Sequence, residues 1–194
     1  MAYNAFTVTQ DELASAAKWN FLGGNDEYFN TQVGAGFSST SSTVWWEELG
    51  RTTLETAGDT ITSPTLTPRK FLHCLVSITP TGTVDYRIRF NGDTGSNYSR
   101  RRSTNGSADS TATSGTAIEV TSVITRSFFS YFDVINIATN EKLVNVKRLN
   151  AATLRDEVAG KWANSSNQIT TVSIVNTDTG SYDIGSELIV LGHD

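Results

Sequence analysis

The chain has 194 residues, of which 18% are charged and 38% are hydrophobic, and its formal net charge is −5 at pH 7. A chain of this length buries roughly 70% of its unfolded surface as one domain, so we expect a self-sufficient core. Nucleic-acid binding requires an excess of Lys and Arg, and the acidic balance argues against that class. No basic start with an apolar core and no apolar run of about 18 residues occurs, which predicts a soluble protein made in the cytosol.

The first 32 residues are predicted to form an arm that contains a short helix. Thr9 and Glu12 form a capping box, in which each side chain accepts a hydrogen bond from a free backbone N–H, and the helix is expected over residues 10–20. Such a helix is too short to be stable alone in water, so it must pack on its own domain or on another protein. The arm residues expected to contact a partner are Phe6, Leu13, Trp19 and Phe21.

Residues 33–43 are rich in Ser, Thr and Gly and are predicted to be a flexible linker. Residues 44–194 are predicted to form the main domain. Their alternating apolar positions and regular turn signals predict strands at 44–55, 70–79, 84–90, 97–103, 117–124, 128–137, 142–147, 154–162, 168–176 and 186–191. The fold class is therefore all-β, an antiparallel jelly-roll-like β-sandwich, and residues 104–116 are expected to be a long surface loop.

The chain's only concentrated positive charge lies around a predicted hairpin of residues 84–102. Val84, Tyr86, Ile88 and Phe90 alternate with polar residues, and the next seven residues are turn formers. If the two strands pair, guanidinium groups gather on one sheet face that could bind an acidic partner or a sister subunit. The alternative is an exposed polar face with scattered ion pairs. The residues of this predicted basic face are Arg87, Arg89, Arg100, Arg101 and Arg102.

Nucleophilic catalysis finds no support in the sequence, because no Gly-x-Ser-x-Gly motif and no reactive Cys with a His partner is present. The carboxylate pairs at 47–48 and 156–157 are adjacent on strands, so their side chains point to opposite faces and cannot flank one glycosidic bond. We therefore predict that the chain is not an enzyme. Cys74 lies in an apolar run and is predicted to be a small buried hydrophobe.

A metal site is also not expected, nor is a cofactor. The only histidines, His73 and His193, fall on separate predicted strands, and there is no second Cys for a zinc site. Calcium ligands could come from Asn91, Asp93 and Asn97, but their spacing is not that of an EF-hand and turn residues have the same composition. Trp45 and Trp46 point to opposite sides of a strand, so one is expected in the core and the other against a partner or a loop.

Several phrases lie scattered over residues 44–194: 48–54 (ELGRTTL), 89–98 (RFNGDTGSNY), 133–139 (DVINIAT), 160–164 (GKWAN) and 187–194 (ELIVLGHD), together with Ser103, Asn105-Gly106 and 108–110 (ADS). They resemble structural proteins of tailed-phage virions. The resemblance implies a nonenzymatic homotrimer that decorates or cements the capsid and binds the major capsid protein or another virion protein. It implies a location on the virion, on the capsid surface or the tail. From the acidic charge and the lack of a long apolar run we expect no nucleic-acid or membrane partner.

Two alternatives stay open at this point. One is a head or tail fibre or adaptor, since short helical openings also precede such β-domains. The other is a glycan-binding domain that recognises host surface glycans through exposed aromatic side chains and the loop at 104–116.

Overall fold

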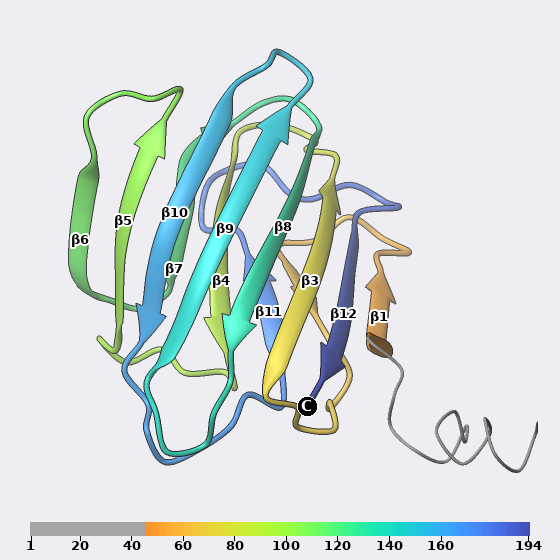
Figure 1. Cartoon of the computed structure of the whole chain (residues 1–194). Coiled ribbons are helices and arrows are strands. Elements are labelled where there is room, and N and C mark those ends of the chain that lie inside the picture. Colours follow the sequence, from red (N-terminus) through yellow and green to blue (C-terminus); the bar gives the residue numbers. More distant parts are fainter. Residues whose placement is uncertain (1–45) are drawn as a thin grey trace, which may run out of the picture. The chain divides into compact units, whose positions relative to one another are not determined.

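The computed structural model describes residues 46–194, and the predicted arm, the linker and the arm residues Phe6, Leu13, Trp19 and Phe21 lie outside them. The described residues form two antiparallel sheets (Figure 1) and contain no helix. The predicted all-β class and sandwich arrangement are therefore confirmed for this part of the chain.

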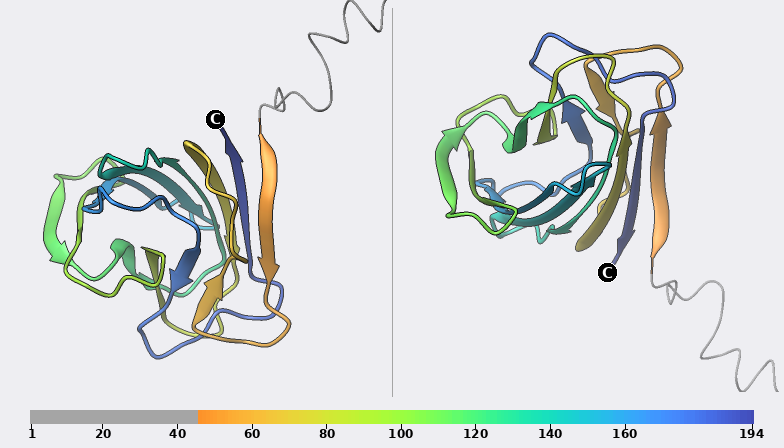
Figure 2. Two further views of the ribbon diagram at one scale, coloured as in Figure 1. Left: turned by 90° about the horizontal axis from the view of Figure 1, so that it is seen from below. Right: turned by 90° about the horizontal axis from the view of Figure 1, so that it is seen from above.

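The larger sheet has eight strands and the smaller sheet has four. The order along the larger sheet is β1 (Glu47–Thr53), β12 (Glu187–His193), β3 (Phe71–Ile78), β8 (Phe128–Ile135), β9 (Lys142–Asn150), β10 (Arg155–Trp162), β5 (Tyr98–Thr104) and β6 (Ser110–Gly115). The order along the smaller sheet is β2 (Thr60–Thr62), β11 (Val172–Val175), β4 (Val84–Phe90) and β7 (Ile118–Ile124). Seen from either end, the larger sheet curls around the smaller one (Figure 2).

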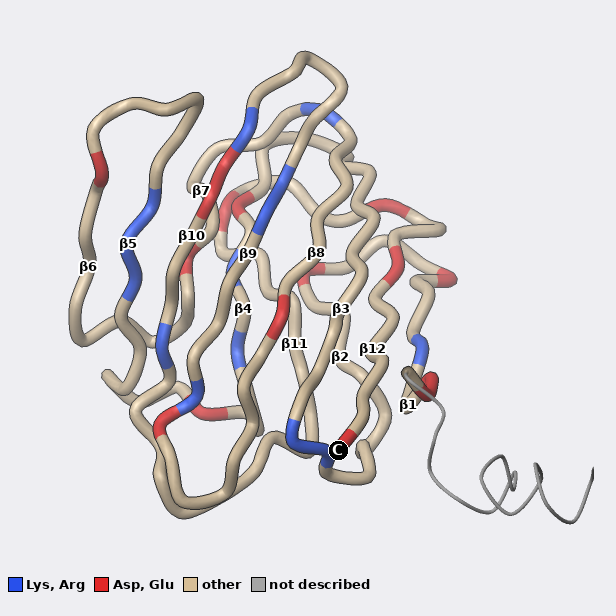
Figure 3. Tube along the Cα trace, viewed as in Figure 1, with Lys and Arg blue, Asp and Glu red and all other residues tan. Residues whose placement is uncertain are grey.

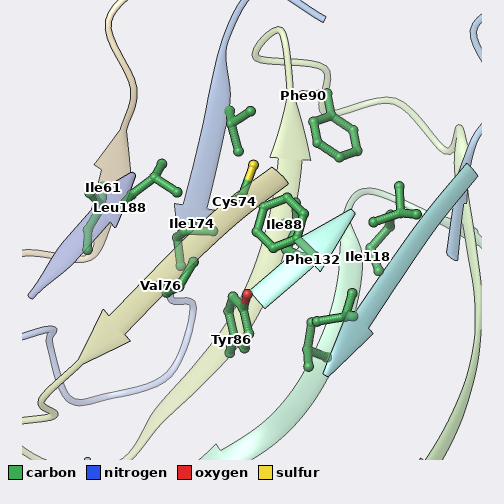
Figure 4. Packing of buried hydrophobic residues seen from close by; sticks show 14 of the residues in the cluster. Ile61, Cys74, Val76, Tyr86, Ile88, Phe90, Ile118, Phe132, Ile174 and Leu188 are labelled. Carbon is green, nitrogen blue, oxygen red and sulfur yellow. The ribbon is translucent and has the colours of Figure 1, made fainter. Parts of the chain in front are cut away.

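The core lies between the two sheets and is built from alternate residues of each strand. On β3 the inward residues are Leu72, Cys74, Val76 and Ile78, all of them buried. Side chains from both sheets point toward one another there, among them Phe132 of β8 (Figure 4). The free thiol of Cys74 is buried as predicted, and burial raises its pKa well above the ordinary value, so it behaves as an apolar group.

The predicted hairpin of residues 84–102 is wrong, although both of its strands exist. β4 pairs with β11 and β7 in the smaller sheet, whereas β5 pairs with β10 and β6 in the larger one. The turn that contains Asn91 and Gly92 at positive φ therefore carries the chain from one sheet to the other. Asn91 fixes this crossing, because its side-chain oxygen accepts hydrogen bonds from the backbone N–H groups of Thr170 and Thr171, at 2.8 and 3.0 Å.

Two short strands were absent from the prediction. The expected loop at 104–116 contains β6, an edge strand whose sequence STATSG has no apolar alternation. β2 has only three residues, and one of them, Ile61, is buried in the core. Both strands form because a neighbouring strand supplies hydrogen bonds, a cause that leaves no periodic signal in the sequence.

Candidate functional site: the outer face of the larger sheet

The outer face of the larger sheet consists of the side chains that point away from the core. Antiparallel pairing aligns them in rows across β3, β8 and β9, because directly opposite residues point to the same side. The four rows are Phe71–Ile135–Leu143, His73–Asp133–Asn145, Leu75–Tyr131–Lys147 and Ser77–Phe129–Leu149. The two end rows are mainly apolar, and the two middle rows carry the polar groups.

Exposed apolar side chains gather on this outer face. Among the described residues, eight large hydrophobic side chains are exposed, and six of them lie here with exposures of 36% to 54%. The six are Trp46, Phe71, Phe129, Ile135, Leu143 and Leu149. The other two, Val123 and Ile184, lie elsewhere, on β7 and in the segment before β12. Such a concentration of apolar groups on one face marks an interaction surface.

The central part of this face, which we call the β8–β9 patch, comprises Phe129, Tyr131, Asp133 and Ile135 of β8 and Leu143, Asn145, Lys147 and Leu149 of β9. Apolar residues occupy its four corners, since Phe129 pairs with Leu149 and Ile135 pairs with Leu143. Both strands are internal to the sheet and are paired with a neighbour on each side, so the patch lies on regular strands and not on a loop.

Beside the patch lies an aromatic–histidine cluster formed by Trp46, Phe71, His73, Tyr131 and His193. The Trp46 ring lies 4.5 Å from the ring of His193 and 5.5 Å from that of His73. His193 also stacks on Phe71 at 5.0 Å. The two histidines, which the sequence assigns to separate strands, meet because β12 and β3 are neighbours in the sheet.

One carboxylate of the face is bound to a histidine of this cluster. Nδ1 of His73 lies 2.7 Å from Oδ1 of Asp133, and the two side chains are 26% and 52% exposed. The bond fixes the orientation of the imidazole and leaves Nε2 available to another partner. A hollow of about 230 Å³ opens alongside, lined by residues that include Trp46, Phe71, Asn145 and His193.

Charged residues on the β5–β10 side of the outer face are paired with one another. Arg101 binds Asp109 at 2.8 Å, and Lys161 binds Glu141 at 2.7 Å. Figure 3 shows these positive segments on β5 and β10 next to acidic ones. Exposed pairs of this kind contribute only about 0–1 kcal/mol each, so they leave the apolar rows as the main feature of the face.

The five arginines of the predicted basic face do not share one face. Arg101 points outward on the larger sheet, whereas Arg100 and Arg102 of the same strand point to the other side and approach Glu119 at 2.8 and 3.6 Å. Arg87 of the smaller sheet reaches the same carboxylate at 3.5 Å. Glu119 is thus shared by three guanidinium groups, which accounts for the arginine-rich sequence by local charge pairing.

Arg89, the fifth arginine, donates a hydrogen bond from Nε to the Thr116 carbonyl oxygen at 3.3 Å. The physical reason for the split is that β4 and β5 belong to different sheets. The predicted role of these arginines in partner binding stays a prediction.

The candidate calcium ligands serve a structural purpose. Asp93 accepts hydrogen bonds from the Trp162 indole N–H at 2.7 Å, from the Asn97 amide at 2.9 Å and from the Gly95 N–H at 2.8 Å. These donors lower the pKa of Asp93, with the Trp162 indole contributing most. Both carboxylate oxygens accept hydrogen bonds, and these bonds hold the turn together.

The carboxylate pairs on the strands separate as their spacing predicts. Asp156 points inward and forms a buried ion pair with Arg148, in which Nε lies 2.8 Å from Oδ2, while Glu157 is on the outer face. At the sheet edge, Glu47 binds Arg69 and Glu48 binds Arg51. Within residues 46–194 no three His, Cys, Asp or Glu side chains are grouped as a metal site would require. Residues 46–194 provide no helix that could cross a membrane.

No family model and no curated protein matches the chain. Among solved structures, the chain is similar to a mutant of the alginate lyase Aly36B in complex with alginate tetrasaccharide, at 12% sequence identity and a TM-score of 0.36, over 74% of this chain and 80% of that one. This similarity to an enzyme contradicts two predictions: that the chain is a nonenzymatic virion structural protein, and that it is not an enzyme. Both are corrected and neither is carried further. At this identity and TM-score the similarity assigns neither a substrate nor catalysis to this chain.

The sequence contained part of the signal for this site. On β8 and β9 some consecutive residues are both apolar, as in Phe128-Phe129 and Leu143-Val144. Because consecutive side chains point to opposite faces, this pattern is typical of a strand with apolar groups on both faces. The contact of His73 with Asp133, by contrast, joins residues 60 apart and depends on strand order.

Proposed function

We propose that this domain associates with a second copy of the chain through the β8–β9 patch. The observation that carries the proposal is the position of the exposed apolar side chains of residues 46–194: four of the eight form the corners of this patch, and two more, Trp46 and Phe71, lie beside it on the same face. Full burial of a Leu or Phe side chain stabilises by about 1.5–3 kcal/mol, so covering several of them supplies a substantial driving force for association.

The register of the patch makes it self-complementary. A two-fold axis that runs along the strands between β8 and β9 places each residue of β8 opposite the β9 residue with which it pairs in its own sheet. Phe129 then meets Leu149 of the partner subunit, and Ile135 meets Leu143 of the partner subunit. Aligned packing of two sheets is a common arrangement in sandwiches, with an angle of about 30° between strand directions.

The polar residues of the patch also match under this axis. Tyr131 meets Lys147 of the partner subunit, and a phenol both accepts a hydrogen bond from an ammonium and offers its ring face to it. Asp133 meets Asn145 of the partner subunit, whose amide is a donor for the carboxylate. One two-fold rotation thus gives matching contacts to both the polar centre and the apolar corners of the patch.

The mass of the full chain, measured by light scattering during size-exclusion chromatography over a range of concentrations, tests this proposal. We expect a species larger than the monomer, and we expect Leu149→Lys and Leu143→Lys to convert it to monomer. Val123→Lys and Ile184→Lys are matched controls, because these exposed apolar residues lie off the face and should leave the mass unchanged.

A monomeric wild type at all concentrations, or equal effects of the face and control substitutions, would contradict the proposal. The measured mass also separates a two-fold pair from the homotrimer that the sequence resemblance implies. The jelly-roll description of the sandwich, the N-terminal helical arm and a location on a virion likewise stay predictions.

Oligosaccharide binding by the aromatic–histidine cluster is a second candidate. It is favoured by the hollow of about 230 Å³, where the rings of Trp46 and Phe71 stand next to the polar side chains of Asp133 and Asn145. Aromatic faces pack on the apolar faces of sugar rings while polar groups bind hydroxyls. A glycan array probed with the full chain tests this candidate. Trp46→Ala should abolish binding to any glycan that the wild-type chain binds, whereas Leu149→Ala, at the opposite end of the face, should not.

A further inference from the structure

We propose that association through the β8–β9 patch takes up a proton at His73, so that it strengthens as the pH falls from 8 to 6. This inference rests on the proposed association. It concerns the regulation of that same face and starts from the bond between His73 and Asp133.

The charge of this pair depends on the imidazole. When His73 is neutral, Nδ1–H donates to the Asp133 carboxylate, and the pair carries one negative charge. When His73 is protonated, the pair is an ion pair with no net charge. Histidine is the residue type whose charge ordinarily changes between pH 5 and 8.

The uncharged and aromatic groups near His73 are Tyr131 of β8 and Trp46, which precedes β1, and His193 of β12 lies on the far side of Trp46. Two charged side chains lie near this row, and each has another partner. Lys147, one row from Asp133, lies 4.0 Å from Glu157, and Glu48, which shares the His73 row through Leu191, is paired with Arg51. Arg69 is engaged by Glu47 and Asp194 at the sheet edge. Among the ion pairs of residues 46–194, the one that includes Asp133 is its pair with His73.

Association would remove water from this carboxylate. Asp133 is 52% exposed in the single copy. Under the proposed two-fold axis it lies in the interior of the patch, one row from Ile135 and Leu143. Desolvation of an unpaired carboxylate is costly, whereas a carboxylate paired with an imidazolium and hydrogen-bonded to an amide is far less so.

The sign of the pH dependence follows from this difference. The associated state binds a proton at His73 more tightly than the separate copies do, and linkage then requires that association tighten as protons become available. His193 lies outside the patch, with its ring between Trp46 and Phe71 and its Nδ1 3.1 Å from the Asp194 carbonyl oxygen, so it provides a control position.

The test is the dissociation constant of the full chain, measured by sedimentation velocity at pH 8 and pH 6. For the wild type we expect association at least about tenfold tighter at pH 6, the effect of one pKa unit of differential proton binding. Asp133→Asn should be tight at pH 8 and should not tighten at pH 6, because a protonated His73 then has no carboxylate partner. His73→Gln should be weak at both pH values, with a ratio near one. His193→Gln is the matched control and should keep the wild-type direction.

Four outcomes are distinguishable. A wild-type chain that is monomeric at both pH values overturns the proposed association and this inference with it. A wild-type chain that associates with the same constant at pH 8 and pH 6 overturns only this inference. So does Asp133→Asn if it retains the pH dependence. Loss of the dependence in both variants, with thermal melting curves like the wild type, supports it.

Discussion

The two faces of the larger sheet use the same residue types for different purposes. Neighbours in sequence illustrate this. Arg148 is buried with Asp156, whereas one position away on the same strands Lys147 is exposed and Glu157 is half-buried, 4.0 Å from it. Leu72 is buried in the core and Leu143 is 44% exposed on the outer face. The inner face therefore holds the fold together, and the outer face is available for association.

Arg148→Ala should produce the largest loss of folding stability. Removal of the guanidinium leaves the Asp156 carboxylate buried without its ionic partner, and such losses amount to about 3–5 kcal/mol. Lys147→Ala, the adjacent outer residue, should change the free energy of unfolding by less than about 0.5 kcal/mol. Urea denaturation of both variants measures the difference, and similar midpoints would contradict the division between the two faces.

Leu72→Ala should rank next. Loss of this buried side chain removes core contacts and leaves a cavity, at a cost of about 2–4 kcal/mol. Leu143→Ala removes the same atoms from the outer face and should cost less than about 1 kcal/mol of folding stability. The order should reverse when association is measured, since only Leu143 belongs to the patch. Thermal denaturation, together with light scattering, checks both halves of this prediction.

Asp93→Asn should have the smallest effect, and that effect should depend on pH. The hydrogen bonds from Trp162, Asn97 and Gly95 lower the pKa of Asp93 in the folded chain. The ionised carboxylate therefore contributes stability above the ordinary Asp pKa of about 3.9, and the contribution is lost as the pH falls through the lower folded value. We expect a loss of roughly 1 kcal/mol at pH 7, discounted for exposure.

Unfolding free energies of the wild type and Asp93→Asn at pH 7 and pH 3 provide the measurement. The difference between the two chains should shrink at the lower pH, because protonation removes the advantage of the wild type. A difference that stays constant would show that the Asp93 charge is not what the Trp162 indole stabilises.

The amino-acid sequence by itself determined which positions of each strand face the core. The two-residue period on β3 and β4 identified Leu72, Cys74, Tyr86 and Ile88 as one side, and these residues are buried. A two-residue period indicates which face of the strand each side chain occupies, and it depends only on residues close together in the sequence. The same reasoning predicted that adjacent carboxylates such as Asp156 and Glu157 would point apart.

The tertiary structure alone decided which strands are neighbours. The sequence of residues 84–90 and 97–103 predicts a hairpin, yet the two strands lie in different sheets. Residues 84–90 pair with β11 and residues 97–103 pair with β10, both of which are distant in the sequence. That choice separated the arginines and brought His73, Asp133 and His193 together on adjacent strands. Strand pairing over long sequence separations depends on the packing of the whole core, and a local pattern carries no record of it.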